Sequence, residues 1–453
     1  MSEISFILNG EPVSADDPSI TLLDYVRLQK GLTGTKEGCN EGDCGACTVM
    51  IAALEDGEMV HRAVNSCILL LGQMQGKSVR TVESLGGNHP VQEAMVEHHG
   101  SQCGFCTPGI VMSLAAAHIE GRQDHADVLA GNLCRCTGYA PILRAAEAVA
   151  HTKVPEAGYD EAALINALDG HGFTELDEFA DWYEANPDAV LVGGATEVGL
   201  VLTKELKQPE KFGFLGQITA LQNISREDSG LRIGAGVLLA RLRGMVAGKY
   251  PQFAEMLRRF GSVQVRNSAT IGGNIANGSP IADTPPALIA LGASITLRKG
   301  AARREILLED YYVAYGKQDR ASGEFIESLF IPDQDDRLGV YKISKRFDQD
   351  ISALCGAFNI AVEGGVVTSA CIAFGGMAAT PKRAAAVEAA LVGQPWNEAT
   401  IKPAQAAFTT DYTPISDQRG SAAYRQILAQ NLLMRYYLEQ TGKARVRVVG
   451  ATP

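Results

Sequence analysis

The sequence of 453 residues has no long run of apolar side chains. A helix needs about 18 to 20 uninterrupted apolar residues to span a bilayer. The longest apolar stretches, near residues 189–202 and 286–297, are interrupted by glycines and polar side chains. The first residues, Met-Ser-Glu-Ile-Ser, lack the charged and then apolar pattern of a secretory signal. We therefore expect no membrane insertion and a cytoplasmic protein.

Basic residues are in the minority, since 40 Lys and Arg stand against 52 Asp and Glu and the net charge is -12. Nucleic-acid binding needs a basic surface, so we expect no nucleic-acid partner. Cysteine is scarce in the later part of the chain: of ten cysteines, only Cys355 and Cys371 follow residue 140, and we expect them to be buried as small apolar residues. The other eight cysteines all lie before residue 140. In a cytoplasmic protein this clustering indicates metal binding.

The first cysteine set has the spacing of a plant-type [2Fe-2S] site. Four residues separate Cys39 from Cys44, two separate Cys44 from Cys47, and Cys67 follows on a separate segment. Glycines alternate with the first three cysteines, which allows positive φ angles and close approach of the backbone. Structural zinc is the alternative, but it prefers two Cys-x-x-Cys pairs. The spacing therefore favours an iron-sulfur cluster.

The residues around this set predict a small β-grasp module. Asn9-Gly10 is a strong hairpin signal, Thr21 is a candidate helix N-cap, and Gly31 ends that helix. We expect the last part, residues 76–85, to close the module. The strands are expected at residues 4–8, 11–15, 48–53 and 60–67, the last of which delivers the fourth cysteine.

A second cysteine set comprises Cys103, Cys106, Cys134 and Cys136. Thr107-Pro108 and Ala140-Pro141 each predict a helix start close after a cysteine pair, because proline favours the first helical turn. A negatively charged cluster is favoured there by the positive ends of the helix dipoles. Zinc is a stronger alternative for this set than for the first. However, Cys-x-Cys is an awkward zinc half-site, so we expect a second [2Fe-2S] cluster.

Two glycine-rich loops follow in the middle of the chain. Residues 189–199 predict a buried strand, a glycine loop and then a helix, and residues 266–283 contain a second loop with Gly272-Gly273. Consecutive backbone amides in such loops can cradle a pyrophosphate, although either loop can also serve packing alone. Residues 234–239 lack the third glycine of a Rossmann fingerprint, so we expect no Rossmann site.

The last part of the chain predicts an α+β domain. A strand is expected at residues 340–342, a hairpin at residues 358–374 with Gly364-Gly365 at its tip, and an amphipathic helix at residues 424–438.

The motifs together resemble the iron-sulfur and flavin portion of the molybdenum hydroxylases, with a domain order similar to that of xanthine dehydrogenases. The most specific are Gln102–Gly109, Asn132–Tyr139, Val192–Glu197 and Thr270–Asn274. The resemblance covers nearly the whole chain and implies a multidomain α+β fold. Its parts are a β-grasp ferredoxin-like domain at 1–83, a helical [2Fe-2S] domain at 84–153, a linker at 154–174, an α+β FAD-binding domain similar to that of vanillyl-alcohol oxidase at 175–335, and an α+β C-terminal flavoprotein domain at 336–453.

The resemblance also implies cofactor contacts. It assigns Cys39, Cys44, Cys47 and Cys67 to one cluster, Cys103, Cys106, Cys134 and Cys136 to the other, and places Tyr315 near the flavin ring. Residues 315–318 differ from the sequence that is usual in the family at this place. The resemblance is therefore weakest for the residues at the flavin edge where nicotinamide docks. The implied FAD contacts are Leu191, Val192, Gly193, Gly194, Ala195, Thr196, Glu197, Val198, Gly199, Phe260, Gly261, Thr270, Gly273, Asn274, Asp283, Ile326 and Lys342.

The implied function is electron transfer, with no catalytic acid or base in this chain. Purine would be oxidised at a molybdopterin cofactor on a large partner subunit. Electrons would pass through the second cluster, the first cluster and FAD to NAD+. A heterotetramer with two copies of each chain is expected. The alternatives are the redox subunit of an aldehyde, nicotinate or carbon monoxide dehydrogenase, or a non-catalytic scaffold stabilised by metal.

Overall fold

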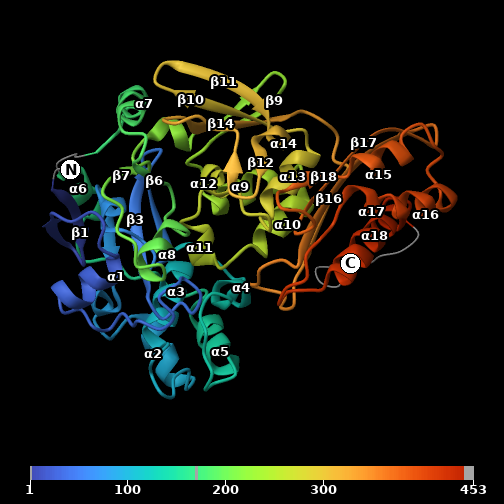
Figure 1. Ribbon diagram of the computed structural model, residues 1–453. Helices are drawn as coiled ribbons and strands as arrows, with labels where there is room; N and C mark the ends of the chain where they lie inside the picture. The colour runs from blue at the N-terminus through green and yellow to red at the C-terminus, as the bar shows by residue number, and fades with distance from the viewer. Residues whose placement is uncertain (1–2, 169–171, 443–453) are drawn as a thin grey trace.

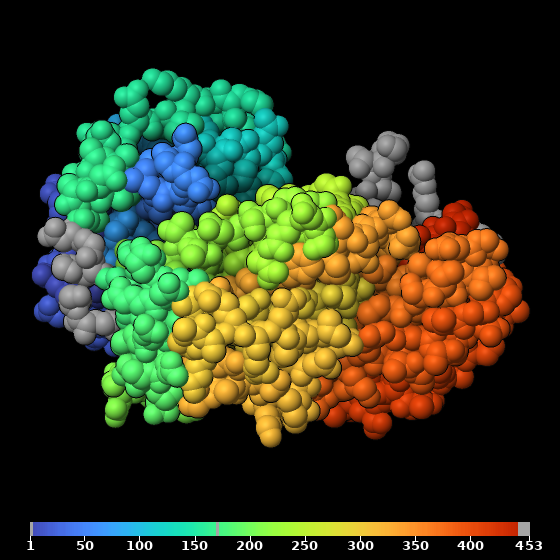
Figure 2. Space-filling view, turned by 90° about the horizontal axis from the view of Figure 1, so that it is seen from above, coloured from blue at the N-terminus to red at the C-terminus, as the bar shows by residue number. Residues whose placement is uncertain are grey.

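The computed structural model describes residues 3–168 and 172–442, which form a multidomain α+β protein. The chain runs from a blue and teal N-terminal region, through a green and yellow middle region, to an orange and red C-terminal region (Figure 1). The space-filling view shows the three regions side by side, with the middle one in contact with both others (Figure 2). In the described part of the chain, no helix combines the length and apolar character that a membrane span requires.

The N-terminal region begins with the expected β-grasp sheet, in the strand order β2-β1-β5-β3-β4. The Asn9-Gly10 turn joins β1 and β2, and β5 pairs in parallel with β1 and antiparallel to β3. Thr21 caps the following helix as expected, but only one turn is α-helical before a π-helical turn at Tyr25–Gln29. The elements are β1 (Ile4–Leu8), β2 (Glu11–Ala15), α1 (Leu22–Asp24), β3 (Thr48–Glu55), β4 (Glu58–Asn65) and β5 (Ser78–Arg80).

A helical unit follows and packs around its own apolar core. Both expected helix starts are present, because α3 begins at Thr107 directly after Cys106 and α5 begins at Ala140, each with proline in its first turn. The elements are α2 (Pro90–Glu97), α3 (Thr107–Ile119), α4 (His125–Leu129) and α5 (Ala140–Val149).

The segment between the helical unit and the middle region contains two helices, α6 (Glu161–Asn166) and α7 (Leu176–Ala185). α6 lies inside the expected linker and was not predicted from the sequence. It contacts the β-grasp sheet through β1 and β3, so this part of the linker is docked.

The middle region is built on a five-stranded sheet in the order β11-β10-β14-β9-β8. All neighbouring strands in this sheet are antiparallel. A separate pair, β6 and β7, is parallel and leads into the first glycine loop. The apolar stretch at residues 286–297 is divided between the end of one helix and the start of a strand. The strands are β6 (Val190–Val192), β7 (Phe212–Phe214), β8 (Ile224–Glu227), β9 (Gly230–Gly234), β10 (Ser294–Lys299), β11 (Ala302–Leu307), β12 (Tyr312–Ala314), β13 (Lys317–Gln318) and β14 (Phe325–Pro332). The helices are α8 (Val198–Thr203), α9 (Leu239–Ala247), α10 (Pro251–Arg258), α11 (Val263–Arg266), α12 (Ile271–Asn277), α13 (Thr284–Ala290) and α14 (Leu308–Tyr311).

The C-terminal region is an antiparallel sheet, β15-β16-β17-β18, covered by helices. Helix α13 is buried along its whole length and contacts β16 and β17, so the core of the middle region continues into this sheet. The elements are β15 (Leu338–Ile343), β16 (Leu354–Glu363), β17 (Val366–Gly375), β18 (Lys382–Arg383), α15 (Ala385–Leu391), α16 (Glu398–Ala406), α17 (Phe408–Asp411) and α18 (Ala422–Gln440).

Candidate metal centres and cofactor cavity

The first cysteine set gathers in the loop before β3. The amide of Cys39 donates to Cys44 Sγ at 3.3 Å, and the amides of Asp43 and Cys44 donate to Cys39 Sγ at 3.3 Å. Hydrogen bonds with the thiols of Cys44 and Cys67 lower the pKa of Cys39. Amides aimed at sulfur are the donors that an anionic cluster needs, so these residues fit a [2Fe-2S] cluster.

The other half of this set lies deeper. Cys47 and Cys67 are buried, and a hydrogen bond with Cys67 lowers the pKa of the Cys47 thiol. Hydrogen bonds therefore link the four thiols in the order Cys44, Cys39, Cys67 and Cys47, so all four lie close enough together to share two irons. Within residues 3–168 and 172–442, no group of three or more His, Cys, Asp or Glu side chains is placed so that it could hold a single metal ion.

The second set gathers at the starts of α3 and α5 and is more exposed. The thiols of Cys106 and Cys134 are hydrogen-bonded neighbours, and so are those of Cys103 and Cys136. Burial and then the hydrogen bond with Cys134 raise the pKa of Cys106 to about 12. Cys103 and Cys136 are exposed to solvent. This set therefore offers two pairs, with one pair at the surface.

One backbone hydrogen bond joins the two cysteine sets. The amide of Leu133, next to Cys134, donates to the carbonyl of Cys44 at 2.8 Å. The two loops are in such close contact that a Cβ on Gly45 would lie 2.1 Å from the carbonyl oxygen of Gly131. A residue with a side chain would separate the loops, so glycine at position 45 permits this short connection.

A buried polar node supports the same contact. Gln264 of α11 is fully buried, and its Nε2 donates to Ser113 Oγ and to Asn132 Oδ1, both at 3.0 Å. Asn132 in turn donates to the carbonyl of Gly45 at 3.1 Å and to Thr48 Oγ1 at 3.3 Å. Residues from the middle region, the helical unit and the β-grasp sheet therefore meet between the two cysteine sets.

A cavity of about 740 Å³ lies in the middle region and brings both glycine loops together. Its size is within the range of small-molecule and cofactor sites, roughly 300–1,000 Å³. The expected FAD residues that line it are Leu191, Gly193, Gly194, Ala195, Thr196, Glu197, Val198, Phe260, Gly261, Thr270, Gly273, Asn274, Asp283, Ile326 and Lys342.

The two loops pack against each other without room for side chains. A Cβ on Gly194 would lie 2.0 Å from the carbonyl oxygen of Ser268, and a Cβ on Gly193 would lie 2.7 Å from Thr270 Oγ1. Thr270 caps α12 by accepting a hydrogen bond from the Gly273 amide at 3.1 Å. The loops therefore form one closely packed wall of the cavity, and the absence of side chains on its glycines fits the close approach of a diphosphate.

A buried ionic group lies on the cavity wall. Lys342 Nζ is 2.6 Å from Asp283 Oδ2, and Ser352 donates to Asp283 Oδ1 at 2.6 Å. Lys342 also donates to Ser352 Oγ at 2.8 Å, and all three residues are almost completely buried. The resemblance assigns Asp283 to the FAD contacts. In the structure both of its carboxylate oxygens already have partners.

Three of the expected FAD residues do not line the cavity. Val192 is fully buried in an apolar cluster, and Gly199 packs so closely on Ile68 that a Cβ would lie 2.4 Å from its carbonyl oxygen. Tyr315 follows β12 and is 74% exposed. The fold thus places these residues beside the cavity wall or at the surface, which their position in the motifs did not reveal.

Several other residues that line the cavity were not predicted from the sequence. Asp43 lines the cavity from the first cysteine loop, and Arg320, Gln349, Ile351 and Ser352 line it from elsewhere. Asp43 is adjacent to Cys44, so this loop reaches the cavity directly. No motif predicts that contact, because it depends on how the β-grasp sheet packs on the middle region.

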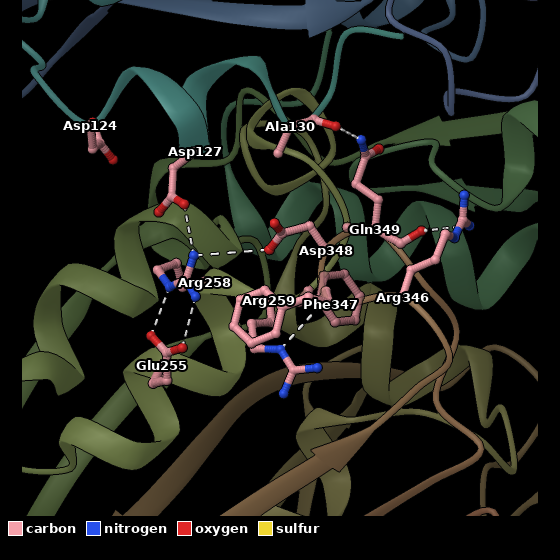
Figure 3. A network of polar contacts seen from close by, with 12 residues as sticks. Asp124, Asp127, Ala130, Glu255, Arg258, Arg259, Arg346, Phe347, Asp348 and Gln349 are labelled. Carbon is pink, nitrogen blue, oxygen red and sulfur yellow. Dashed lines mark hydrogen bonds and ion pairs between the residues drawn. The ribbon is translucent and has the colours of Figure 1, made fainter. Parts of the chain in front are cut away.

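The cavity segment at residues 344–352 is held by a network that crosses the regions (Figure 3). Arg258 of α10 donates to Asp127 of α4 at 2.7 Å and lies 3.9 Å from Asp348. The guanidinium of Arg259 stacks on the Phe347 ring at 4.3 Å, and Gln349 donates to the carbonyl of Ala130. This segment therefore contacts the helical unit, α10 and the cavity.

Comparison with protein families identifies four consecutive matches. Residues 6–71 match the 2Fe-2S iron-sulfur cluster binding domain, and residues 81–147 match the [2Fe-2S] binding domain. Residues 171–334 match the FAD binding domain in molybdopterin dehydrogenase, and residues 339–440 match the CO dehydrogenase flavoprotein C-terminal domain. The chain belongs to the molybdenum hydroxylase family. Its matched domains are two [2Fe-2S] domains, an FAD-binding domain and a flavoprotein C-terminal domain.

Similar molybdenum hydroxylases include several xanthine dehydrogenases. The chain is 31% identical to that of Emericella nidulans over 96% of this chain and 38% of the relative. It is 32% identical to that of Drosophila subobscura over 98% of this chain and 39% of the relative. The chain thus spans less than half the length of these relatives.

Solved structures of the family match a shorter part of the chain. Carbon monoxide dehydrogenase from Hydrogenophaga pseudoflava has a TM-score of 0.55 and 26% identity, over 58% of this chain and 94% of its own. Quinoline 2-oxidoreductase from Pseudomonas putida 86 has a TM-score of 0.56 and 25% identity, over 60% of this chain and 96% of its own.

Proposed function

We propose that this chain is the electron-transfer subunit of a xanthine dehydrogenase. In this proposal a partner subunit carries the molybdopterin cofactor and oxidises hypoxanthine and xanthine to urate, and NAD+ is the final acceptor. The observation that carries it is the continuous contact from exposed Cys136, through the Leu133–Cys44 hydrogen bond, to Asp43 on the cavity wall.

The proposal gives the residues of the two sites the following roles. When bound, the clusters carry single electrons and FAD converts between single electrons and a hydride. The two cysteine sets hold the clusters, and the glycine loops hold the FAD diphosphate. The Lys342–Asp283–Ser352 group shapes the wall beside it. No residue of the chain acts as a general acid or base on the purine.

The surface at the second cysteine set suits the partner subunit. Cys103 and Cys136 are exposed there, and Phe105 and Leu133 are each 48% exposed although they are large and apolar. Apolar side chains around a redox centre favour a buried protein contact. We further propose a heterotetramer with two copies of each chain, and a cytoplasmic location, because free thiolates need a reducing compartment.

The redox subunit of another molybdenum hydroxylase is the second candidate, because the similar solved structures are a carbon monoxide dehydrogenase and a quinoline oxidoreductase. Those chains match only about three fifths of this one. The xanthine dehydrogenases instead match cluster and flavin regions together, over 92–98% of the chain. This favours the xanthine dehydrogenase assignment.

The test is to co-purify the chain with its natural partner and measure NAD+ reduction. We expect xanthine and hypoxanthine to support it. Activity with aldehydes and none with purines would overturn the substrate assignment. A colourless preparation that contains zinc and no flavin would overturn the redox function itself.

Cysteine variants test the route. We expect Cys136→Ser to block electron entry from xanthine while NADH oxidation by an artificial acceptor is largely retained. Cys44→Ser should remove one cluster signal in electron paramagnetic resonance and leave the flavin absorbance intact. Cys371→Ser, far from both sets in sequence, is the matched control. Loss of NADH oxidation in Cys136→Ser would show that the order of carriers is wrong.

A further inference from the structure

A second cavity, of about 340 Å³, lies between the β-grasp sheet and the middle region. Strands β3 and β4 and the segment before β5 form one side, and α9 with the residues around Gly216 and Asn267 forms the other. Gly193 and Thr270 line both cavities, so they form the wall between them. Apart from this wall and Leu215, the two cavities are lined by different residues.

Three cationic side chains line this second cavity: Arg62, Lys77 and Arg241. Glu55 neutralises Arg62 through two hydrogen bonds. Arg241 lies 3.7 Å from Asp56, whose side chain is 83% exposed, and this distance is too long for a direct hydrogen bond. The positive charge in the cavity therefore exceeds the negative charge.

Lys77 is the cavity cation without an ion pair in the described part of the chain, and Glu55, which is bonded to Arg62, acts on it only from a longer distance. Among residues 3–168 and 172–442, its Nζ has neither an ion pair nor a hydrogen bond, although both of its backbone polar groups are bonded. A Cβ on Gly216, across the domain boundary, would lie 3.8 Å from that Nζ. Desolvation lowers the pKa of Lys77 to about 8. Removing an ammonium group from water without a partner is unfavourable, and a bound anion would relieve this cost.

We propose that this cavity binds the phosphoryl group of a small molecule, with Lys77 as its principal contact. Arg241 also lines the cavity, and its Nη1 donates to the carbonyl of Gln222 at 2.8 Å. Its Nη2, which lies 3.7 Å from exposed Asp56, is the group that can contact the anion. Apolar Leu215, Leu238 and Ile165 also line the cavity. A phosphate monoester with an apolar body matches a cationic end and an apolar wall better than free phosphate does.

The position of the site predicts a role at the domain contact. Its walls come from the β-grasp sheet and from the back of the glycine loops, and Gln73 donates across them to the carbonyl of Gly193 at 3.2 Å. An occupant that touches both sides stabilises their docking by mass action. This role does not depend on which substrate the partner subunit oxidises.

The experiment is calorimetric titration of the full chain, purified with its cofactors, using inorganic phosphate and phenyl phosphate as probes. We expect one saturable site per chain and tighter binding of phenyl phosphate. Lys77→Met should weaken binding at least tenfold, while Lys77→Arg should retain it. Lys207→Met removes an exposed lysine that pairs with Glu205, and this matched control should bind as the wild type does.

Each outcome decides the proposal. Equal affinity for both probes supports a site for free phosphate, and preference for phenyl phosphate supports an organic monoester. The absence of saturable binding for both probes overturns the proposal, as does wild-type affinity in Lys77→Met. The thermal unfolding midpoint of Lys77→Met, measured without anion, shows whether the variant folds. This midpoint should be at least that of the wild type, because the change removes a desolvated charge. If that midpoint falls, Arg241→Gln is the deciding variant, and unchanged affinity in it overturns the proposal.

Discussion

At the scale of single residues, the cofactor cavity depends on positions that tolerate no side chain. Gly194 is the clearest, because a Cβ would lie 2.0 Å from the carbonyl oxygen of Ser268, which belongs to the second glycine loop. The contact is between two backbones, so neither loop can yield by turning a side chain. The same closeness places both loops on one wall of the cavity.

We therefore predict that Gly194→Ala separates the two loops. The variant should lose bound FAD, and its free energy of unfolding should fall by about 1–3 kcal/mol, which is typical of overpacking. Flavin absorbance per chain and thermal unfolding measure the two effects. Gly244→Ala is the control, because Gly244 lies in α9 with no atom within 4 Å of its added Cβ. That change should raise stability by up to about 1 kcal/mol through helix propensity. FAD retention in Gly194→Ala would contradict the role of the loop contact.

At the scale of elements, α6 holds the segment between the helical unit and the middle region against the β-grasp sheet. Its first residue, Glu161, contacts His61 Nε2 at 2.8 Å, Ser78 Oγ at 2.5 Å and Arg80 Nη2 at 2.7 Å. Burial opposes ionisation of this carboxyl, but hydrogen bonds with His61, Ser78 and Arg80 lower its pKa to about 2. The helix is therefore held by a charge that pairs only in the folded state.

This shift predicts a pH dependence. Because the folded pKa is lowered from 4.5 to about 2, the stabilisation is complete above about pH 4.5 and is lost as the pH falls towards 2. Its size is up to roughly 3 kcal/mol. Glu161→Gln should be less stable than the wild type at pH 7, and the difference should shrink below pH 4.5 in urea unfolding followed by circular dichroism.

The control for α6 is Glu156→Gln, which removes an exposed carboxylate that pairs with Lys153 just before the helix. Surface pairs contribute little, so this variant should unfold as the wild type does at every pH. If Glu161→Gln and the wild type lose stability in parallel between pH 4.5 and 2, then another group is responsible for the acid transition.

At the scale of the whole molecule, a buried polar node is one of the contacts between the N-terminal region and the middle region. Gln264 is fully buried and donates to Ser113 and Asn132, which come from the helical unit, while Asn132 continues to Gly45 and Thr48. The node lies beside the Leu133–Cys44 hydrogen bond. The spacing of the two cysteine sets therefore depends on a side chain from the flavin region.

We predict that Gln264→Leu weakens this assembly. The change removes two buried hydrogen bonds from Gln264 Nε2, while Ser113 Oγ still donates to Asn132 Oδ1. Each lost bond costs about 0.5–1.5 kcal/mol. Thermal unfolding should lose cooperativity, and spin-spin interaction between the two clusters in electron paramagnetic resonance should change. Gln418→Leu alters an exposed glutamine and should change neither. An unchanged spin interaction in a destabilised Gln264→Leu variant would show that the node serves stability alone.

Much of the local structure could be predicted from short-range patterns. Asn9-Gly10 marked the first hairpin, Thr107-Pro108 and Ala140-Pro141 marked two helix starts, and Gly364-Gly365 marked the last hairpin. In each case the backbone preference of a few neighbouring residues determines the element. Helix α6 escaped prediction because its main support, the contact of Glu161 with β4 and β5, is distant in sequence.

The sequence by itself determined the chemical groups of this protein: two cysteine sets with their spacing, two glycine loops and the order of the regions. Spacing and backbone freedom are local properties, so they can be read without a fold. Only the tertiary structure decided that Leu133 bonds to Cys44, that Asp43 reaches the cavity, and that Tyr315 does not. These contacts join residues far apart in the chain, and close packing of whole regions sets them.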